Sequence, residues 1–185
     1  LLEHLGRFIE SRVSFYPNLS GLGRTVGASA ALPQSLEEAL GQPIQPVFAR
    51  RCFSCHSTGS VKAGELQTET LTPGIGCEGC HGPGDSHLRA VEADQTEDLA
   101  IYNPGRWTTD EITYFCGACH RTLEDVVGEN LRGPITARFQ PYRLVLSKCY
   151  SPTDPRISCI ACHDPHQPRS RDPDFYDQKC LVCHR

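Results

Sequence analysis

Apolar residues are scattered along the chain, and only short segments show a regular spacing of hydrophobic and polar positions. The apolar side chains of the first thirteen residues are mainly Leu2, Leu5, Phe8, Ile9 and Val13. Their spacing approximates that of a helical face, so we expect a helix at the N-terminus. A stretch rich in Pro and Gly follows, from Pro17 to Ala31, and predicts irregular structure.

Capping signals predict several further helices. The segment Ser35–Glu38 has the form of a capping box and predicts a short helix that ends at Gly41. Three other cap positions predict further helices. Asp85-Ser86 would cap a helix through residues 87–99, Thr109 or Asp110 would cap a helix that runs into residues 116–120, and Asp174 would cap a helix that carries the last cysteine pair. The best candidate for a strand is residues 138–147 (RFQPYRLVLS), and no sheet is predicted.

Composition agrees with a chain of short elements. The 185 residues include 16 Gly and 14 Pro, and only 38% are hydrophobic, so the side chains alone would build a thin core. We therefore expect a mostly irregular fold with short α-helices and little β-structure. No apolar run approaches the length of a transmembrane helix, so no membrane span is expected. The net charge of −4 argues against binding to nucleic acid through a basic face.

The cysteines are the most informative residues. Ten of the eleven form C-x-x-C pairs, and a histidine follows every pair: CFSCH (52–56), CEGCH (77–81), CGACH (116–120), CIACH (159–163) and CLVCH (180–184). We number these segments as the first to the fifth motif. The paired cysteines are Cys52, Cys55, Cys77, Cys80, Cys116, Cys119, Cys159, Cys162, Cys180 and Cys183. Cys149 stands alone.

A C-x-x-C pair has three interpretations: half of a zinc site, a redox dithiol, or an attachment site for haem c. Zinc sites assembled from pairs favour an even number of pairs and do not require the following histidine. Five pairs that are all followed by histidine therefore favour covalent haem attachment. Five haem c groups with iron are expected, each held by two thioethers. Their proximal iron ligands would be His56, His81, His120, His163 and His184.

The motifs also divide the chain. Residues 1–50 carry no motif and form a haem-free N-terminal extension, which is a candidate assembly segment, whereas residues 51–185 form a pentahaem cytochrome c domain. With 185 residues for five macrocycles, too little polypeptide is present to insulate the haems from one another. Closely stacked haems are therefore expected to serve as the core.

Two motifs extend into longer patterns. CEGCHGPGDSH (77–87) resembles the C-x-x-C-H-G-P-G-x-x-H signature of multihaem c-type cytochromes, and CIACHDPH (159–166) resembles the C-x-x-C-H-x-P-H form of the same superfamily. The resemblance covers about residues 52–184. It implies electron transfer through haems that mostly have two histidine ligands, with His87 and His166 as distal ligands. His166 lies three residues from His163, a tether too short to pass round the porphyrin edge, so it should serve a different haem.

The supply of distal ligands is limited. Eight histidines and no methionine are present, and after the five proximal ligands only His4, His87 and His166 remain. At least two irons per chain therefore have no distal His or Met, even if identical subunits exchange ligands. Cys149 is either a thiolate ligand, a buried free cysteine or part of an intermolecular disulfide. His4 is either a solvated residue or a ligand, including to a haem of a neighbouring subunit.

These observations predict an electron carrier without catalytic residues, either a discrete shuttle or a subunit of an extracellular conductive filament or complex. Its partners would be redox proteins or identical subunits. Identical subunits would assemble into a homopolymer. The alternative is an oxidoreductase that acts on a small nitrogen, sulfur or oxygen species at an open iron. A cysteine-rich structural domain with empty motifs is a third class. Because thioether attachment takes place outside the cytoplasmic membrane, we expect a periplasmic or extracellular protein whose signal peptide has been removed.

Overall fold

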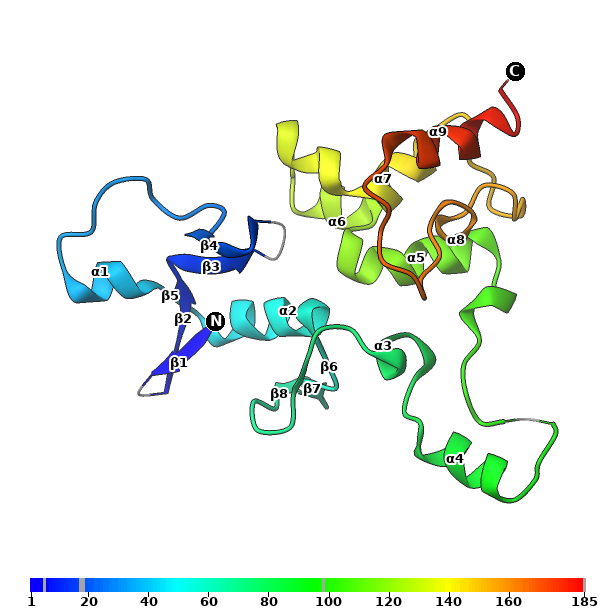
Figure 1. Ribbon diagram of the computed structural model, residues 1–185, viewed down its shortest axis with the longest axis horizontal. Helices are drawn as coiled ribbons and strands as arrows, with labels where there is room; N and C mark the ends of the chain where they lie inside the picture. The colour runs from blue at the N-terminus through cyan, green and yellow to red at the C-terminus, as the bar shows by residue number, and fades with distance from the viewer. Residues whose placement is uncertain (5, 17–18, 98, 185) are drawn as a thin grey trace. The chain divides into compact units, whose positions relative to one another are not determined.

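The chain forms two compact units, Leu1–Gly76 and Cys77–Arg185, which are described separately (Figure 1). The computed structural model describes residues 1–4, 6–16, 19–97 and 99–184, with the side chains of Leu2 and His4 left out. The first unit combines small sheets with two helices, and the second is built from short helices and irregular segments. The first motif therefore belongs to the same unit as the segment that precedes it.

The N-terminal segment forms strands, so the helix expected from the spacing of Leu2 to Val13 is wrong. Antiparallel pairing in the order β1-β2-β5 joins three strands: β1 (Leu2–His4), β2 (Arg7–Ser11) and β5 (Gly41–Ile44). Gly6 turns the chain between the first two with φ +70°. Strand β2 is held in an extended form by pairing with β5, thirty or more residues away in the sequence. The spacing of apolar residues within the first thirteen positions does not reveal this distant partner.

A second pair of strands, β3 (Val13–Tyr16) and β4 (Gly21–Arg24), forms an antiparallel hairpin. Side chains alternate along β3, so that Val13 and Phe15 are exposed while Ser14 and Tyr16 are half-buried. Phe15 is paired with Leu22, and these two side chains are 63% and 76% exposed. The hairpin therefore presents an apolar face to solvent.

The helix predicted after Ser35 is present as α1 (Leu36–Leu40), and it ends at Gly41 as expected. The Ser35 hydroxyl accepts a hydrogen bond from the Glu38 amide, whereas the Glu38 carboxylate accepts from the amide of Gln34. Gly41 has φ +143°, and a Cβ there would lie 2.0 Å from the carbonyl oxygen of Glu10. Only glycine permits the helix to end against β2 in this way.

Helix α2 (Pro46–His56) follows directly and ends at the first motif. Pro46 is at the first helical position, where the missing amide proton costs nothing. Two short antiparallel pairs complete the unit: β6 (Ser57–Thr58) with β9 (Thr72–Pro73), and β7 (Val61–Lys62) with β8 (Glu65–Leu66). These pairs correct the expectation of no sheet, although the whole chain has little β-structure, as predicted.

The second unit contains seven α-helices among its described residues: α3 (Cys77–His81), α4 (Asp85–Glu92), α5 (Thr109–His120), α6 (Leu123–Gly128), α7 (Gln140–Val145), α8 (Cys159–Cys162) and α9 (Pro173–Leu181). Two 3-10 segments, η2 (Pro104–Arg106) and η3 (Gly133–Arg138), lie between them. This helix-rich part with irregular connections agrees with the expected fold class.

Several of its helices begin close to the predicted positions. Helix α5 starts after Thr108, whose side chain and that of Glu111 form a reciprocal capping box, so the cap lies one residue before the predicted Thr109. Asp172 caps α9, two residues before the predicted Asp174. Asp85 lies inside the first turn of α4.

Two predictions in this unit need correction. Helix α4 ends at Glu92, well before the expected residue 99. Residues 138–147 are not a strand, because most of them form α7 with Pro141 in its first turn. Proline fixes φ near the helical value and cannot donate a ladder hydrogen bond, so its position favours a helix start over a strand.

Candidate functional site

All five motifs lie at or beside helices, which explains how the paired sulfurs come together. The first and third motifs end α2 and α5, the second forms all of α3, the fourth opens α8, and the fifth begins in the last turn of α9 (Figure 1). Residues three apart on a helical turn face the same side, so each pair presents both thiols to one side of the turn. The structure joins no two of the eleven cysteines, all of which are described, in a disulfide.

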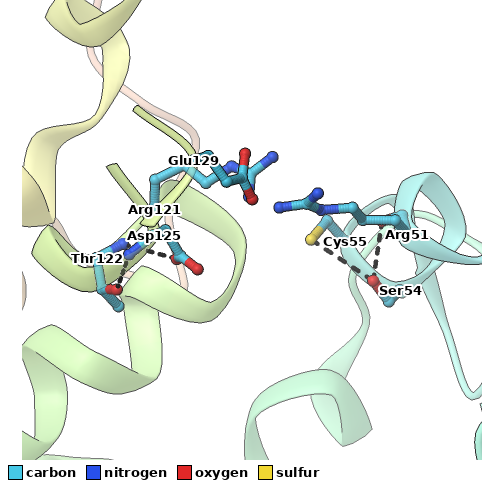
Figure 2. Close-up of polar contacts among 7 residues, drawn as sticks. All are labelled: Arg51, Ser54, Cys55, Arg121, Thr122, Asp125 and Glu129. Carbon is cyan, nitrogen blue, oxygen red and sulfur yellow. Dashed lines mark hydrogen bonds and ion pairs between the residues drawn. The ribbon is translucent and has the colours of Figure 1, made fainter. Parts of the chain in front are cut away.

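In the first motif, contacts with the backbone carbonyl and the ring of Phe53 hold the helical turn in place. The hydroxyls of the buried Ser57 and Ser60 both donate to the Phe53 carbonyl, at 2.6 and 3.1 Å, and the Phe53 ring meets that of Phe8 edge-on at 6.5 Å. In the same turn, the Ser54 hydroxyl donates to the Arg51 carbonyl and lies 3.8 Å from the Cys55 sulfur (Figure 2). Burial, together with the charge of Glu10, raises the pKa of Cys52. His56 is exposed.

The second motif shows how a proximal histidine is oriented. His81 Nδ1 donates a hydrogen bond to the Tyr102 carbonyl at 2.8 Å, and the Tyr102 amide in turn donates to the His81 carbonyl at 3.2 Å. The first bond assigns the ring proton to Nδ1 and leaves the Nε2 lone pair available to a metal. A carbonyl partner on the remote nitrogen is the usual support of a metal-bound histidine.

Gly82 is needed for this arrangement. Its φ is +77°, and a Cβ on it would lie 2.8 Å from Cδ2 of Tyr102. Both the left-handed backbone and the close approach of the Tyr102 ring therefore exclude a larger residue. The glycine directly after C-x-x-C-H thus lets Tyr102 reach His81.

His87, predicted as a distal ligand, is held in the same manner as His81. It lies in α4, and its Nδ1 donates to the Leu99 carbonyl at 2.8 Å. Its Nε2 is likewise the available nitrogen. Neither the Tyr102 nor the Leu99 carbonyl was found by sequence reasoning, because backbone acceptors 21 and 12 residues away carry no side-chain signature.

His166, the other predicted distal ligand, lies in the irregular segment after the fourth motif. Asp164 accepts a hydrogen bond from the His166 amide at 2.9 Å, and the same carboxylate oxygen lies 3.6 Å from His166 Nδ1. The His166 ring is nearly parallel to the His81 ring, with an interplanar angle of 12° and a centroid separation of 6.0 Å. The second and fourth motifs are therefore brought together through these two histidines.

The third and fourth motifs also meet. The thiols of Cys116 and Cys159 are hydrogen-bonded to each other, and the Thr113 hydroxyl contributes a further hydrogen bond to Cys159. The shared bond raises the pKa of Cys116, with burial adding to the effect, and it lowers the pKa of Cys159 to about 7. Once the thioethers form, neither sulfur titrates, and the contact then reports only that the two attachment sites are adjacent.

The fifth motif lies beside the fourth. The ring of Tyr176, in α9, packs against the ring of His163 with a centroid separation of 5.2 Å. After α9 ends, the amides of Cys183 and His184 both donate to the Cys180 carbonyl. This turn keeps the last cysteine and histidine in register with Cys180.

The remaining candidate ligands are less constrained. His4 ends β1 and pairs with Arg7, but its side chain lies outside the described part of the structure. Cys149 is exposed in the turn after α7, so the expectation that it could be a buried cysteine is wrong. The thiolate-ligand and intermolecular-disulfide interpretations stay predictions.

A cavity of about 160 Å³ opens between α5, α6 and α7. Two tyrosine–carboxylate pairs line it: Tyr150 donates to Asp110 and Tyr114 donates to Glu124, both at 2.7 Å. Burial and the Asp110 carboxylate raise the pKa of Tyr150 to about 12. The residues that line it include no motif cysteine and no histidine.

The zinc interpretation requires several ligands gathered around one point. Within the described ranges, no three His, Cys, Asp or Glu residues are placed to hold a metal ion directly. No helix in those ranges is long and apolar enough to cross a membrane. The donor arrangement at the second motif, with a helical cysteine pair and a histidine held through Nδ1, fits covalent haem with axial imidazole.

Comparison with known proteins agrees with this chemistry. Residues 29–82 match the family model described as Cytochrome c554 and c-prime, a match that covers the first two motifs and fewer than half of the residues. No curated protein and no solved structure matches the chain significantly. The family match supports a c-type cytochrome with covalently bound haem that functions in electron transfer.

Proposed function

We propose that the chain is a pentahaem c-type cytochrome that carries electrons along closely spaced haems. The observation that carries this proposal is the support of His81, whose Nδ1 donates to the Tyr102 carbonyl at 2.8 Å while Nε2 stays available beside a cysteine pair. The same five-residue pattern occurs four more times. The family match over the first two motifs supports the same chemistry independently.

The residues have separable roles. Ten cysteines would anchor the macrocycles, and the five motif histidines would hold the irons from one side. The haem iron, when bound, supplies a one-electron couple whose potential depends on its axial ligands and their hydrogen bonds. The Tyr102 carbonyl fixes the ring of His81 through Nδ1, and it would tune that couple without direct contact with the metal.

Close spacing is supported by contacts between motifs. The Cys116–Cys159 hydrogen bond joins the third attachment site to the fourth, and the Tyr176–His163 contact joins the fourth to the helix that carries the fifth. Such adjacency favours electron transfer from one macrocycle to the next within the second unit.

Haem content tests the proposal directly. The protein is produced with a cytochrome c maturation system, and a pyridine haemochrome assay together with the mass of the denatured chain is expected to give five covalent haems. The five groups would add about 3 kDa. Replacement of both cysteines of one motif by serine should remove one haem and leave four. Haem that extracts into acidified organic solvent, or fewer than four covalent haems, would contradict the assignment.

We further propose that assembly with identical subunits or redox partners is part of this function, outside the cytoplasm, in the periplasm or the extracellular space. The exposed apolar face of the β3–β4 hairpin, with Val13, Phe15 and Leu22, supports a role of the N-terminal segment in assembly. Native mass measurement and electron microscopy test it. A monodisperse monomer at high concentration would exclude a filament.

The enzymatic alternative is favoured by one observation, the shortage of distal histidines. An iron without a sixth ligand can bind a small molecule such as nitrite, hydroxylamine or sulfite. Electron paramagnetic resonance separates the two functions: high-spin ferric signals that change when these compounds are added support an enzyme. Spectra that do not respond to any of them support an electron carrier.

A further inference from the structure

We propose that His166 is the second axial ligand of the iron held by His81, so that the segment after the fourth motif completes the haem site of the second. This inference rests on the proposed haem attachment and adds which iron His166 serves. The two histidines are 85 residues apart in sequence, yet their rings are nearly parallel.

The distance between the two rings carries the argument. Their centroids are 6.0 Å apart, with an interplanar angle of 12°. Two imidazoles bound through nitrogen to opposite sides of one metal ion, at bond lengths of about 2.0 Å, have ring centres about 6 Å apart. Rings in face-to-face van der Waals contact would instead be separated by about 3.5–4 Å. The observed separation is too large for directly superposed rings and matches that of two imidazoles bound to one metal ion.

The polar neighbours of both rings agree with this placement. His81 Nδ1 donates to the Tyr102 carbonyl, and His166 Nδ1 lies 3.6 Å from the Asp164 carboxylate. In each histidine the polar partner is on Nδ1, so Nε2 is the nitrogen available for coordination. A carboxylate and a carbonyl are the two partners most often found on metal-bound histidines.

The backbone around His166 is shaped to present the side chain. The Asp164 carboxylate accepts from the His166 amide at 2.9 Å, and the Gln167 amide donates to the Asp164 carbonyl at 3.1 Å. These bonds close a turn directly after His163. Because three residues are too few to carry His166 round the macrocycle held by His163, the iron that it reaches belongs to another motif.

With this assignment, the fourth motif and the segment after it contact the sites of three other motifs. It would share a ligand segment with the second motif, a thiol contact with the third and a ring contact with the helix of the fifth. The order of the haem sites in space would therefore differ from the order of the motifs in the sequence. It would also leave His87 and His4 as the only spare histidines for the other four irons.

Spin state tests the pairing in the full-length holoprotein. His166→Ala is expected to convert one of five ferric haems from low spin to high spin, measured by electron paramagnetic resonance and optical spectra. The same substitution is then made in a C77S/C80S background, which lacks the haem held by His81. There, His166→Ala should cause no further conversion. Equal conversion in both backgrounds, or none in the five-haem protein, would overturn the pairing.

A second variant keeps the test decisive if His166→Ala accumulates poorly. His166→Met retains a sixth ligand and is expected to raise the midpoint potential of one haem, because methionine ligation favours the reduced state. This shift should likewise vanish in the C77S/C80S background. Unchanged potentials with five haems attached would refute only the pairing, whereas a wild-type chain without covalent haem would refute the proposed function itself.

Discussion

The glycine after the second motif illustrates how a single residue can position a candidate ligand, His81. At Gly82, φ is +77° and the ring of Tyr102 occupies the space of a Cβ. Gly133 has the same φ of +77°, but nothing lies within 4 Å of its Cβ position. A comparison of alanine substitutions at the two glycines therefore separates the cost of backbone strain from the cost of the contact with Tyr102.

We expect Gly82→Ala to destabilise the holoprotein more than Gly133→Ala. Each substitution costs about 1–2 kcal/mol for a left-handed alanine, and Gly82→Ala adds about 1 kcal/mol of overpacking. Gly82→Ala should also perturb the spectrum of one haem, because movement of Tyr102 weakens its bond to His81. Thermal unfolding followed by Soret absorbance measures both effects.

Tyr102→Ala supplies the matched control, since it removes the ring but keeps the carbonyl that His81 uses. In the Tyr102→Ala background, Gly82→Ala and Gly133→Ala should cost the same. If Gly82→Ala is already no worse than Gly133→Ala in the wild-type protein, the close approach of Tyr102 has no energetic role.

Much of the candidate site follows from the sequence at this scale. The cysteine pairs and their histidines are contiguous, so local spacing alone identifies them. Longer signatures predict His87 and His166 as distal ligands, and the structure places a polar partner beside Nδ1 of both. The carbonyls of Tyr102 and Leu99 could not be found, because any residue type supplies a carbonyl and only the folded loop brings these two close.

At the scale of elements, α5 and α6 are joined at an unusually close point. A Cβ on Gly117, which is buried within the third motif, would lie 2.5 Å from Cγ2 of Thr122. Thr122 cannot rotate freely, because its hydroxyl caps α6 by accepting from the Asp125 amide, and Asp125 accepts from the Thr122 amide in return (Figure 2). The composition of the third motif is thus set by helix packing as well as by haem attachment.

Gly117→Ala is expected to destabilise the protein although alanine is the better helix former. Glycine to alanine within a helix ordinarily stabilises by about 0.5–1 kcal/mol. The clash with Thr122 should reverse the sign and give a net loss of about 1–2 kcal/mol. Chemical denaturation of the holoprotein, followed by circular dichroism, measures this difference.

The double variant Gly117→Ala/Thr122→Ser is the control, because serine keeps the capping hydroxyl and lacks only the methyl group. It should recover most of the loss, while Thr122→Ser alone should have a small effect. No recovery in the double variant would show that the cost of Gly117→Ala arises elsewhere.

Prediction of elements succeeded where the signal was local. The caps near α1, α5 and α9 were found within two residues, since capping depends on a few adjacent side chains. It failed at residues 1–13, where a distant strand, β5, decides the structure of β2. It failed again at residues 138–147, where Pro141 favours the start of a helix and most of the segment forms α7.

At the scale of the whole molecule, the polypeptide builds very little core of its own. Among the described residues, the buried apolar side chains other than proline are Ala49, Ala90, Ile112 and Val126. Two separate compact units of half the mass would together expose about 10,600 Å², whereas this chain exposes 14137 Å². The side chains therefore build a thin core, as the composition predicted, and we expect apolar macrocycles to cover part of the exposed surface.

The division into two units gives the last prediction. Residues 77–185 carry four motifs together with His87 and His166, whereas residues 1–76 carry the first motif and His4. Produced separately with a tag that contains no histidine, the two fragments should bind four haems and one haem. In the larger fragment, four irons share only two spare histidines, so at most two haems can have two histidine ligands, whatever its oligomeric state.

Spectra of the isolated 77–185 fragment therefore measure how many of its four haems have two histidine ligands, separately from how many haems are attached. At least two of its four haems should be high-spin, bind carbon monoxide when reduced, or show a ligand other than histidine. His166→Ala in this fragment should reduce the number of bis-histidine haems by one, as in the full-length protein. Four bis-histidine haems in a fragment with six histidines would require eight ligands, and would contradict either the number of haems or the proximal role of the motif histidines.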